Sequence, residues 1–257
     1  MKKRLTAERR NEIAKLLLQD GNIKAGELAK RFDVSAETIR KDLIYLEEQG
    51  IAQKSYGGAI ASTELLERPI ALKQMENMDI KTKIAKKALD FIPEKGTVIL
   101  DTGSTVYALA KLLTLRSGLT VFTNSIIVLN LLADSENDVF SLGGKVRGSS
   151  KGLVGPWGLR ALESIHADAA FLGSDGFKNF EGPSSASYEE AELKKAMAAC
   201  CDRAVLLCDS TKFSRDSLFQ FCKWEDLCAV VTNRDKSGLF HTAISEISKK
   251  TNVILSD

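Results

Sequence analysis

The chain has 257 residues, which is long for one globular core and short for three, so its length predicts two domains of unequal size. Hydrophobic residues make up 44% and charged residues 27% of the sequence, a composition that excludes a disordered or collagen-like chain. The apolar runs are far shorter than the roughly 20 residues needed to cross a bilayer, and the basic amino terminus lacks the apolar segment of a signal peptide. We expect a cytoplasmic protein with no membrane partner.

The cysteines and histidines predict neither disulfides nor a metal site. The five cysteines are odd in number and form no C-x-x-C pair, so we expect them to be reduced and buried as small apolar residues. The two histidines, His166 and His241, lie far from each other and from the pair Cys200–Cys201. Zinc ligands are ordinarily clustered in the sequence, so no metal is predicted.

Positive charge is concentrated near the amino terminus. The formal net charge is +2 for the whole chain and +3 for residues 1–58 alone. Half of the cations in that segment fall in the first fifteen residues: Lys2, Lys3, Arg4, Arg9, Arg10 and Lys15. They are interpreted either as an arm that contacts DNA phosphates or as the solvated start of a helix.

Three amphipathic helices are predicted in the first fifty residues. Thr6 caps the first helix, which ends at Asp20–Gly21. Apolar residues at helical spacing predict a short second helix over residues 25–32. Ser35 caps a third helix that runs to Gln49, and its predicted inner face consists of Ala36, Ile39, Leu43 and Leu46.

The third helix has the pattern of a DNA recognition helix. At 100° per residue, Glu37, Lys41 and Ile44 lie opposite the buried face, with Thr38, Arg40 and Tyr45 on its flanks. Residues 51–60 predict two short strands around a glycine-containing turn, so that residues 1–60 have the layout of a winged helix-turn-helix. Such a helix reads base edges in the major groove, while a wing lies along the phosphates.

The sequence of this region resembles the DNA-binding signature of the DeoR (deoxyribose-operon repressor) family of bacterial regulators. The resemblance rests on Leu28–Ala29, Val34 to Leu43, Leu46–Glu47 with Gly50, and Tyr56 to Ala59; Ser55 stands where a histidine is often found. It implies double-stranded operator DNA as a partner. The predicted DNA-binding residues are Ser35, Glu37, Thr38, Arg40, Lys41, Lys54, Ser55, Tyr56 and Gly57.

A linker over residues 61–79 and a larger α/β domain over residues 80–257 are predicted next. Residues 64–78 are polar and contain Pro69, and a helix is expected from Ile80 to Phe91. Short apolar runs then alternate with helical patterns, which predicts a mostly parallel sheet flanked by helices. The predicted strands lie at residues 98–100, 119–122, 139–142, 169–172, 204–208, 228–231 and 253–255.

Polar segments follow five of these strands, and they predict a ligand pocket because the carboxyl ends of parallel strands meet at one edge. The segment 101–105 opens a helix, whose amino terminus could hold a phosphate or could be a cap without a ligand. It lacks the P-loop lysine and the G-x-G-x-x-G spacing, which favours a small phosphate ester over a nucleotide, and no cofactor is predicted. The other segments are Thr123–Asn124, Gly143 to Arg147, Gly173 to Gly176 and Asp209 to Lys212.

These five segments, in this order, resemble the sensor domain of the DeoR family, whose fold is similar to that of ribose-5-phosphate isomerase. The resemblance implies a phosphorylated sugar as effector, with Thr102 to Thr105 as phosphate loop, Arg147 and Lys212 as cationic partners, and Asp101, Asn124 and Asp175 as hydroxyl-binding groups. The predicted effector-binding residues are Asp101, Thr102, Gly103, Ser104, Thr105, Thr123, Asn124, Gly143, Gly144, Arg147, Gly173, Asp175, Gly176, Glu190, Lys194, Asp209 and Lys212.

The sequence leaves three classes of function open. The preferred one is a homo-oligomeric repressor of a carbohydrate-utilisation operon, released by a sugar phosphate and without enzymatic activity. A sugar-phosphate isomerase would need a base, and Glu189, Glu190 and Lys194 lie on one predicted helix, although Glu190 and Lys194 also have the spacing of a solvated ion pair. A protein-interaction adaptor would bind neither DNA nor sugar phosphate.

Overall fold

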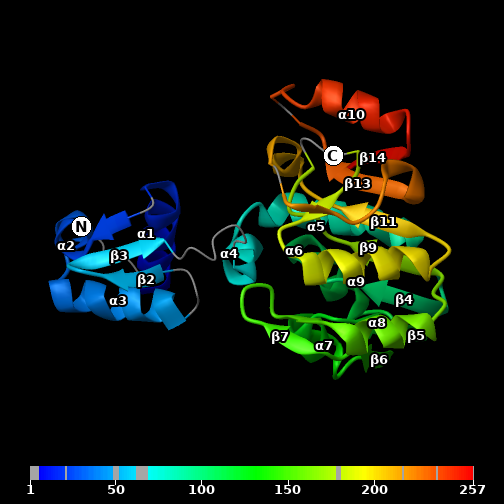
Figure 1. The fold of residues 1–257 in the computed structure, drawn as a ribbon, viewed down its shortest axis with the longest axis horizontal. Helices are drawn as coiled ribbons and strands as arrows, with labels where there is room; N and C mark the ends of the chain where they lie inside the picture. The colour runs from blue at the N-terminus through cyan, green and yellow to red at the C-terminus, as the bar shows by residue number, and fades with distance from the viewer. Residues whose placement is uncertain are drawn as a thin grey trace. The chain divides into compact units, whose positions relative to one another are not determined.

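A computed structural model describes residues 6–20, 22–48, 52–61, 69–177, 181–215, 217–235 and 237–256. The chain divides into two compact units, Met1–Leu72 and Lys73–Asp257 (Figure 1). The division falls inside α4 (Ile70–Met75), a helix within the segment that the sequence predicts to be a linker. Residues 62–68 of that linker lie outside the described residues, as do Lys2, Lys3 and Arg4.

The first unit is a winged helix-turn-helix, as predicted. Its helices are α1 (Thr6–Asp20), α2 (Ala25–Phe32) and α3 (Ala36–Glu48). Two wing strands, β2 (Ala52–Ser55) and β3 (Gly58–Ala61), pair antiparallel. A third strand, β1 (Asn22–Lys24), pairs with β3. It was not predicted, because a strand of three residues is too short to show an alternating pattern in the sequence.

The second unit is built on a seven-stranded sheet in the order β14-β13-β11-β9-β4-β5-β6, and every pair in it is parallel. All seven strands had been predicted, within one or two residues at each end. They are β4 (Gly96–Leu100), β5 (Leu119–Thr123), β6 (Asp138–Ser141), β9 (Ala169–Leu172), β11 (Ala204–Leu207), β13 (Ala229–Asn233) and β14 (Asn252–Ser256).

Helices cover both faces of this sheet. One face packs against α5 (Met78–Ala88), α6 (Ser104–Leu113) and α7 (Ile126–Leu132), and the other against α8 (Pro156–Glu163), α9 (Tyr188–Ala199) and α10 (His241–Ser248). Three 3-10 turns, η2 (Leu89–Phe91), η3 (Ser210–Ser214) and η4 (Trp224–Asp226), complete the helical elements described. Helices α7, α8 and α10 were not predicted, since their apolar patterns span two turns or fewer.

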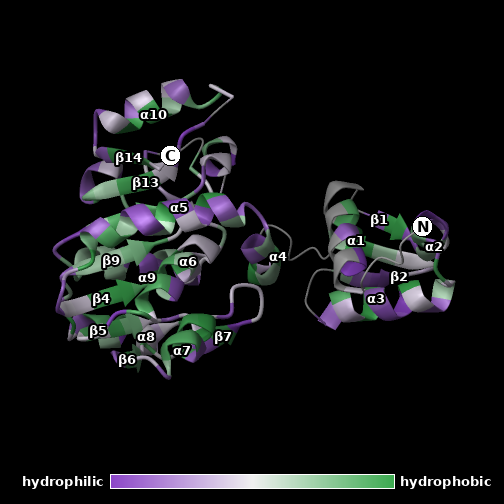
Figure 2. Cartoon of the chain, turned by 180° about the vertical axis from the view of Figure 1, so that it is seen from behind, coloured by the Kyte–Doolittle hydropathy of each residue, from purple (hydrophilic) through white to green (hydrophobic). Residues whose placement is uncertain are grey.

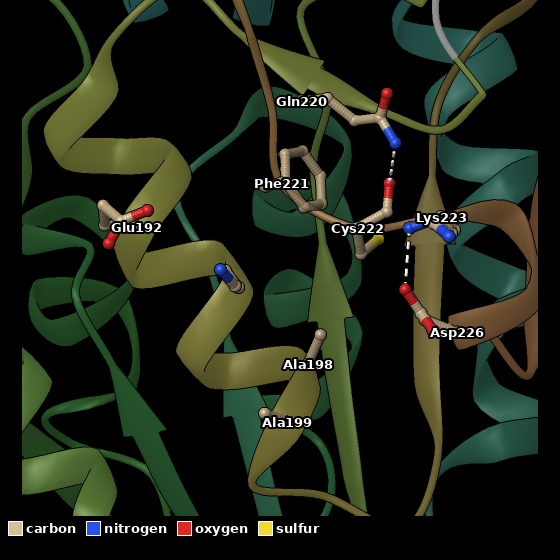
Figure 3. Close-up of a pocket in the computed structure, with 9 residues that line it drawn as sticks. Glu192, Ala198, Ala199, Gln220, Phe221, Cys222, Lys223 and Asp226 are labelled. Atoms are coloured by element: carbon tan, nitrogen blue, oxygen red, sulfur yellow. Dashed lines mark hydrogen bonds between the residues drawn. The ribbon is translucent and has the colours of Figure 1, made fainter.

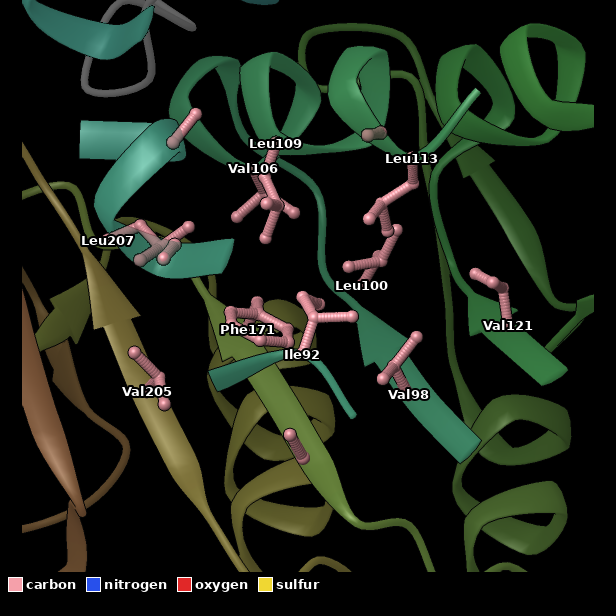
Figure 4. Close-up of a cluster of buried hydrophobic side chains, with 14 of the residues drawn as sticks. Ile92, Val98, Leu100, Val106, Leu109, Leu113, Val121, Phe171, Val205 and Leu207 are labelled. Atoms are coloured by element: carbon pink, nitrogen blue, oxygen red, sulfur yellow. The ribbon is translucent and has the colours of Figure 1, made fainter. Parts of the chain in front are cut away.

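Successive residues of the central strands point into different cores. Val98 and Leu100 of β4 pack with Phe171 of β9 beneath α6 (Figure 4), whereas Ile99 packs on the opposite face with α8 and α9. Both faces of these central strands are buried, so β4 and β9 contain runs of consecutive apolar residues, and β4 is largely green in the hydropathy colouring of Figure 2. This double burial explains why the strands could be predicted from sequence.

Chain order reverses between β4 and β9, which are neighbours in the sheet. Strands β5 and β6 lie on one side of β4, and β11, β13 and β14 lie beyond β9. In open parallel sheets the crevice at the carboxyl ends of two such strands is the usual place for a ligand. Two antiparallel pairs, β7 (Lys145–Arg147) with β8 (Gly152–Val154) and β10 (Ser184–Ser185) with β12 (Phe219–Gln220), lie outside the main sheet.

The prediction for the cysteines is wrong in part. Cys208 is buried, as expected, but Cys228 is exposed and Cys200, Cys201 and Cys222 are only partly buried. Cys228 directly precedes β13 in a connecting segment, where no core covers it. Within the described ranges all five are free thiols, no group of three or more metal-ligating side chains is present, and no helix is long and apolar enough to span a membrane.

Candidate functional site

Helix α3 presents the outward face predicted from its periodicity. The Ser35 hydroxyl accepts a hydrogen bond from the Thr38 N–H (3.1 Å) and caps the helix. Ile39, Leu43 and Leu46 are buried, whereas Glu37, Arg40, Lys41, Ile44 and Tyr45 are exposed. Ala36 was assigned to the inner face, but it is exposed, because the first turn projects past the core.

Two carboxylates hold α3 from opposite flanks. Asp42 is buried and accepts hydrogen bonds from Nε of Arg9 (2.6 Å) and Nε of Arg10 (2.8 Å), both on α1. On the other flank, Glu47 accepts a hydrogen bond from the backbone N–H of Lys54 in the wing (2.9 Å). Arg9 and Arg10 are therefore held by ion pairs to α3, and the nearly buried Arg9 is not part of a solvated helix start.

The wing tip is fully open to solvent. Lys54, Ser55 and Tyr56 are exposed, and Gly57 has a φ of 78°, a conformation that favours glycine. A Cβ on Gly58 would lie 1.9 Å from the carbonyl oxygen of Ile23, so glycine is needed where β3 meets β1. These glycines shape the turn that carries the exposed side chains.

At the switch point of the second unit, Asp101 is the buried centre of a polar network. It follows β4, has no exposed surface, and accepts a hydrogen bond from the N–H of Gly173, which follows β9 (2.9 Å). Its carboxylate also pairs with the buried ammonium group of Lys194 on α9. Burial alone would lower the pKa of Lys194, but the charges of Asp101 and Glu190 outweigh it and raise that pKa, so the ammonium stays protonated.

The predicted phosphate loop lies beside this carboxylate. Gly103, with a φ of 144°, is the N-cap of α6, and Thr102 and Thr105 are buried. A Cβ on Gly173 would lie 3.1 Å from the carbonyl oxygen of Thr102, and one on Gly152 would lie 2.6 Å from Cγ2 of Thr102. Glycines on two neighbouring elements thus allow the loop to lie close to the sheet.

Glu190, at the start of α9, joins the network from a second side. Nε of Arg147 on β7 lies 3.3 Å from its Oε1, and the Ser185 hydroxyl lies 3.3 Å from its Oε2. The Ser187 hydroxyl caps α9 by accepting a hydrogen bond from the backbone N–H of Glu190. Glu190 and Lys194 are both buried on one face of α9, so the solvated ion pair considered from sequence is excluded.

Asp175, two residues beyond Gly173, forms the second charged centre. Its carboxylate accepts from Lys73 Nζ on α4 (2.7 Å), the Ala186 N–H (3.1 Å) and the Ser185 hydroxyl (3.3 Å). Burial would raise the pKa of Asp175, but the charges of Lys73 and Lys212 lower it well below its ordinary value. Burial, and then the charge of Lys73, lower the pKa of Lys212 to about 8.

Several other predicted residues stabilise the local structure at the carboxyl-terminal edge of the sheet. Asn124 donates to the carbonyl of Leu153 (3.4 Å), and Asp209 caps η3 by accepting the Thr211 N–H (3.0 Å). The Thr123 hydroxyl donates to the backbone carbonyl of the last residue of β4. Gly143, Gly144 and Gly176 lie in the turns between these elements, and a Cβ on Gly144 or Gly176 would meet backbone within 2.4 Å.

A separate open pocket of about 590 Å³ lies on the outer side of α9 (Figure 3). Its lining residues come from α9 and from the segment that runs from the end of β12 to the end of η4: Glu192, Lys195, Ala198, Ala199, Gln220, Phe221, Cys222, Lys223 and Asp226. None of the predicted site residues lines it. The buried charges of the strand-end network therefore mark the candidate site.

Comparison with protein families decides the identity of both units. The model of the DeoR-like helix-turn-helix domain matches residues 9–64, and that of the DeoR C terminal sensor domain matches residues 76–234. The chain belongs to the DeoR family. It is a DNA-binding transcriptional regulator, and its first unit is the family's DNA-binding domain.

Named DeoR relatives align over most of the chain. The HTH-type transcriptional regulator GolR of Listeria innocua is 36% identical over 228 residues, which cover 88% of this chain and 90% of GolR. The lactose phosphotransferase system repressor of Staphylococcus epidermidis is 31% identical over 233 residues, which cover 89% of this chain and 92% of that repressor. Among solved structures, ribose 5-phosphate isomerase A of Methanocaldococcus jannaschii aligns with a TM-score of 0.41 and 20% identity, over 53% of this chain and 55% of the isomerase.

Residues that were not predicted complete both sites. Asp42 and Glu47 position α3, and Lys73, Gly152 and Ser185 contact or shape the strand-end network. An aspartate at a buried helical position was the available signal for Asp42. Lys73, Gly152 and Ser185 lie in segments with no strand-end pattern, so only the tertiary structure reveals them.

Proposed function

We propose that this DeoR regulator is the repressor of a carbohydrate-utilisation operon and that a phosphorylated sugar releases it from its operator. The observation that carries the proposal is the buried network at the switch point, in which Asp101, Lys194, Glu190 and Arg147 converge beside the amino terminus of α6. Asp101, Lys194 and Glu190 are buried, and burying charged groups is costly, which favours a functional reason for keeping them there. A polar ligand with both hydroxyl and phosphate groups fits this edge.

The two halves of such a ligand have distinct partners. Carboxylates of Asp101 and Asp175 can accept hydrogen bonds from sugar hydroxyls. The N–H groups and hydroxyls of residues 102–105, at the positive end of the α6 dipole, favour a phosphate, and Arg147 and Lys212 add cationic donors. One relative is named as the repressor of a lactose phosphotransferase system, which agrees with a phosphorylated sugar as the signal.

We further propose that the chain is not an enzyme. An isomerase needs a side chain that is free to take a proton from the sugar and return it. Glu190 lies between Arg147 and the Ser185 hydroxyl, and Lys194 is paired with Asp101. Both side chains are therefore held by contacts within the protein, which suits Glu190 to binding a ligand rather than to transferring a proton.

In the simplest mechanism, a cytoplasmic homo-oligomer, a dimer or tetramer, fixes the spacing of paired DNA-binding domains. Effector binding favours an arrangement that no longer matches the two half-sites. A hundredfold loss of operator affinity requires the effector to bind the released state about 2.7 kcal/mol more tightly. Light scattering with and without DNA measures the number of subunits in each state.

The test uses a duplex that the wild-type protein selects from a random-sequence pool. Its binding is followed by fluorescence anisotropy, with a panel of pentose and hexose phosphates and the unphosphorylated sugars as controls. We expect one phosphorylated sugar to release the duplex from wild type. The Ser104→Asp variant, with a carboxylate in the phosphate loop, should bind the duplex but resist release, because like charges repel.

Two results would contradict the proposal. Aldose–ketose turnover at an ordinary enzymatic rate, on the order of 1–1000 per second, without selective DNA binding would favour the isomerase. Binding of neither DNA nor any sugar phosphate would favour an adaptor.

A further inference from the structure

Two adjacent arginines of α1 share Asp42 but differ in what they leave accessible. The side chain of Arg9 is 10% exposed, so this guanidinium is part of the packing between α1 and α3. That of Arg10 is 28% exposed, although its Nε lies only 2.8 Å from the same carboxylate. Arg10 is therefore fixed at one end and open to solvent at the other.

The Arg10 guanidinium also stacks on an aromatic ring of α3. Its Cζ lies 4.0 Å from the centroid of the Tyr45 ring. Tyr45 follows Lys41 by four residues and so lies about 40° from it around the helix axis, on the exposed side. Arg10 thus reaches from α1 past Asp42 to the border of the outward face of α3.

Most hydrogen-bond donors of Arg10 remain available. A guanidinium has five N–H groups, and the contact with Asp42 uses only the one on Nε. Within the part of the chain that the structure describes, the four N–H groups on Nη1 and Nη2 have no hydrogen-bond acceptor. The cluster also keeps a positive charge, since two arginines share one carboxylate.

We propose that Arg10 contacts a DNA phosphate at the α1 flank of the recognition helix, with Asp42 and Tyr45 as positioning residues. The major groove is about 12 Å wide and a helix with its side chains is about 10–12 Å across, so phosphates of the two strands border its flanks. Arg10 occupies one flank, and the wing, joined to α3 through Glu47 and Lys54, occupies the other.

The rigidity of this arrangement explains why arginine suits position 10 better than lysine. The contact with Asp42 and the ring of Tyr45 together fix the plane of the guanidinium before DNA arrives. A fixed side chain loses less conformational entropy on binding than a free one. A lysine could supply the charge at this position, but it could not make the same planar contacts.

The first test compares Arg10→Gln with Arg160→Gln, a control that removes the same charge from the exposed face of α8. Affinity is measured over a range of salt concentrations on the wild-type-selected duplex and on a scrambled duplex of equal length. We expect Arg10→Gln to lower the slope of log K against log salt by about 0.9, with a similar loss of affinity on both duplexes. Slopes identical to those of Arg160→Gln would overturn the proposal.

The role of Tyr45 has its own readout. Tyr45→Phe keeps the ring and should keep the wild-type salt slope, whereas Tyr45→Leu leaves Arg10 charged but unsupported and should weaken binding several-fold. Equal affinities for the Phe and Leu variants would remove Tyr45 as a positioning residue.

A second measurement on the wild-type protein does not depend on a variant that folds. Phenylglyoxal modifies accessible guanidinium groups, and mass spectrometry of the digested protein gives the extent for each arginine. We expect the selected duplex to slow modification of Arg10 at least fivefold and to leave that of Arg160 unchanged. Equal modification of Arg10 with and without duplex would overturn the phosphate contact.

Discussion

Lys73, in the last turn of α4, forms an ion pair with Asp175 beyond β9, with 2.7 Å between Nζ and Oδ1. Both side chains are less than one-fifth exposed. Asp175 is also one of the carboxylates that we propose for the sugar hydroxyls. A ligand that takes this carboxylate competes with Lys73, so binding at the strand ends would act on α4, where the two units of the chain divide.

Lys73→Gln should therefore uncouple effector from operator. Without the ammonium group, occupation of Asp175 no longer changes the contacts of α4, so we expect the effector-induced change in operator affinity to fall about tenfold or more. Anisotropy titrations with and without the sugar phosphate measure this ratio. Lys83→Gln, at an exposed position on α5, is the matched control, and a wild-type ratio in Lys73→Gln would refute the coupling.

Effector affinity should depend on pH through Lys212. Burial and the charge of Lys73 lower its pKa to about 8, so the side chain loses its proton as the pH rises from 7 to 9. A sugar phosphate is already a dianion in this range and binds the protonated lysine better, so its Kd should increase with pH. Calorimetry at several pH values tests this, and Lys212→Met should bind more weakly with a flatter profile. A wild-type Kd that is constant from pH 7 to 9 would exclude Lys212 from the phosphate site.

The same lysine has the opposite effect on stability. A lysine whose folded pKa lies below its unfolded value binds fewer protons in the native state, so the free energy of unfolding should rise between about pH 8 and 10.5. Denaturant unfolding of wild type and Lys212→Met over this pH range should show a smaller increase in the free energy of unfolding for the variant. Parallel curves for the two proteins would contradict this assignment.

Gly152→Ala should damage the effector site and spare DNA binding. The new Cβ would lie 2.6 Å from Cγ2 of Thr102 and 3.0 Å from the Ser150 hydroxyl, so the phosphate loop must move. Overpacking of this kind costs about 1–3 kcal/mol of stability, and we expect effector affinity to fall at least tenfold. Gly148→Ala, where the Cβ would meet open space, is the control. Equal effector affinities for the two variants would show that the loop does not contact the effector.

Arg40→Ala and Lys41→Ala should weaken operator binding without lowering thermal stability, because both side chains are exposed on α3. A base contact should cost about 1–3 kcal/mol on the selected duplex and little on a scrambled one. Gel-shift titrations on both duplexes, with melting curves as the folding control, decide between base and phosphate contacts. Unchanged affinity in both variants would remove this face from the groove.

The parts of the fold that could be predicted are those in which a short stretch of sequence carries a recognisable pattern. Strands such as β4 and β9 are buried on both faces and therefore read as short apolar runs, and the outward face of α3 follows from a constant angle per residue. Strand β1, by contrast, is defined by pairing with β3, 34 or more residues away. No local pattern encodes such a partner.

The strand-end site shows the same limit. Parallel strands place their carboxyl ends together, so Asp101 and Asp175 were identified from sequence. Lys73 and Ser185 reach the site from outside the main sheet, and Gly152 matters only because Thr102 lies against it. The charge of Arg9 and Arg10 was visible in the sequence, but the ion pairs with Asp42 that fix these side chains were not.

We propose that sugar phosphate and operator DNA are linked through one conformational equilibrium, and calorimetry of effector binding tests this linkage most directly. The effector that releases the duplex is titrated into wild type alone and into wild type saturated with the selected duplex. Linkage requires the Kd for effector to rise in the presence of duplex by the same factor by which effector weakens duplex binding. We predict equal factors, and an effector Kd that is the same with and without duplex would contradict the account.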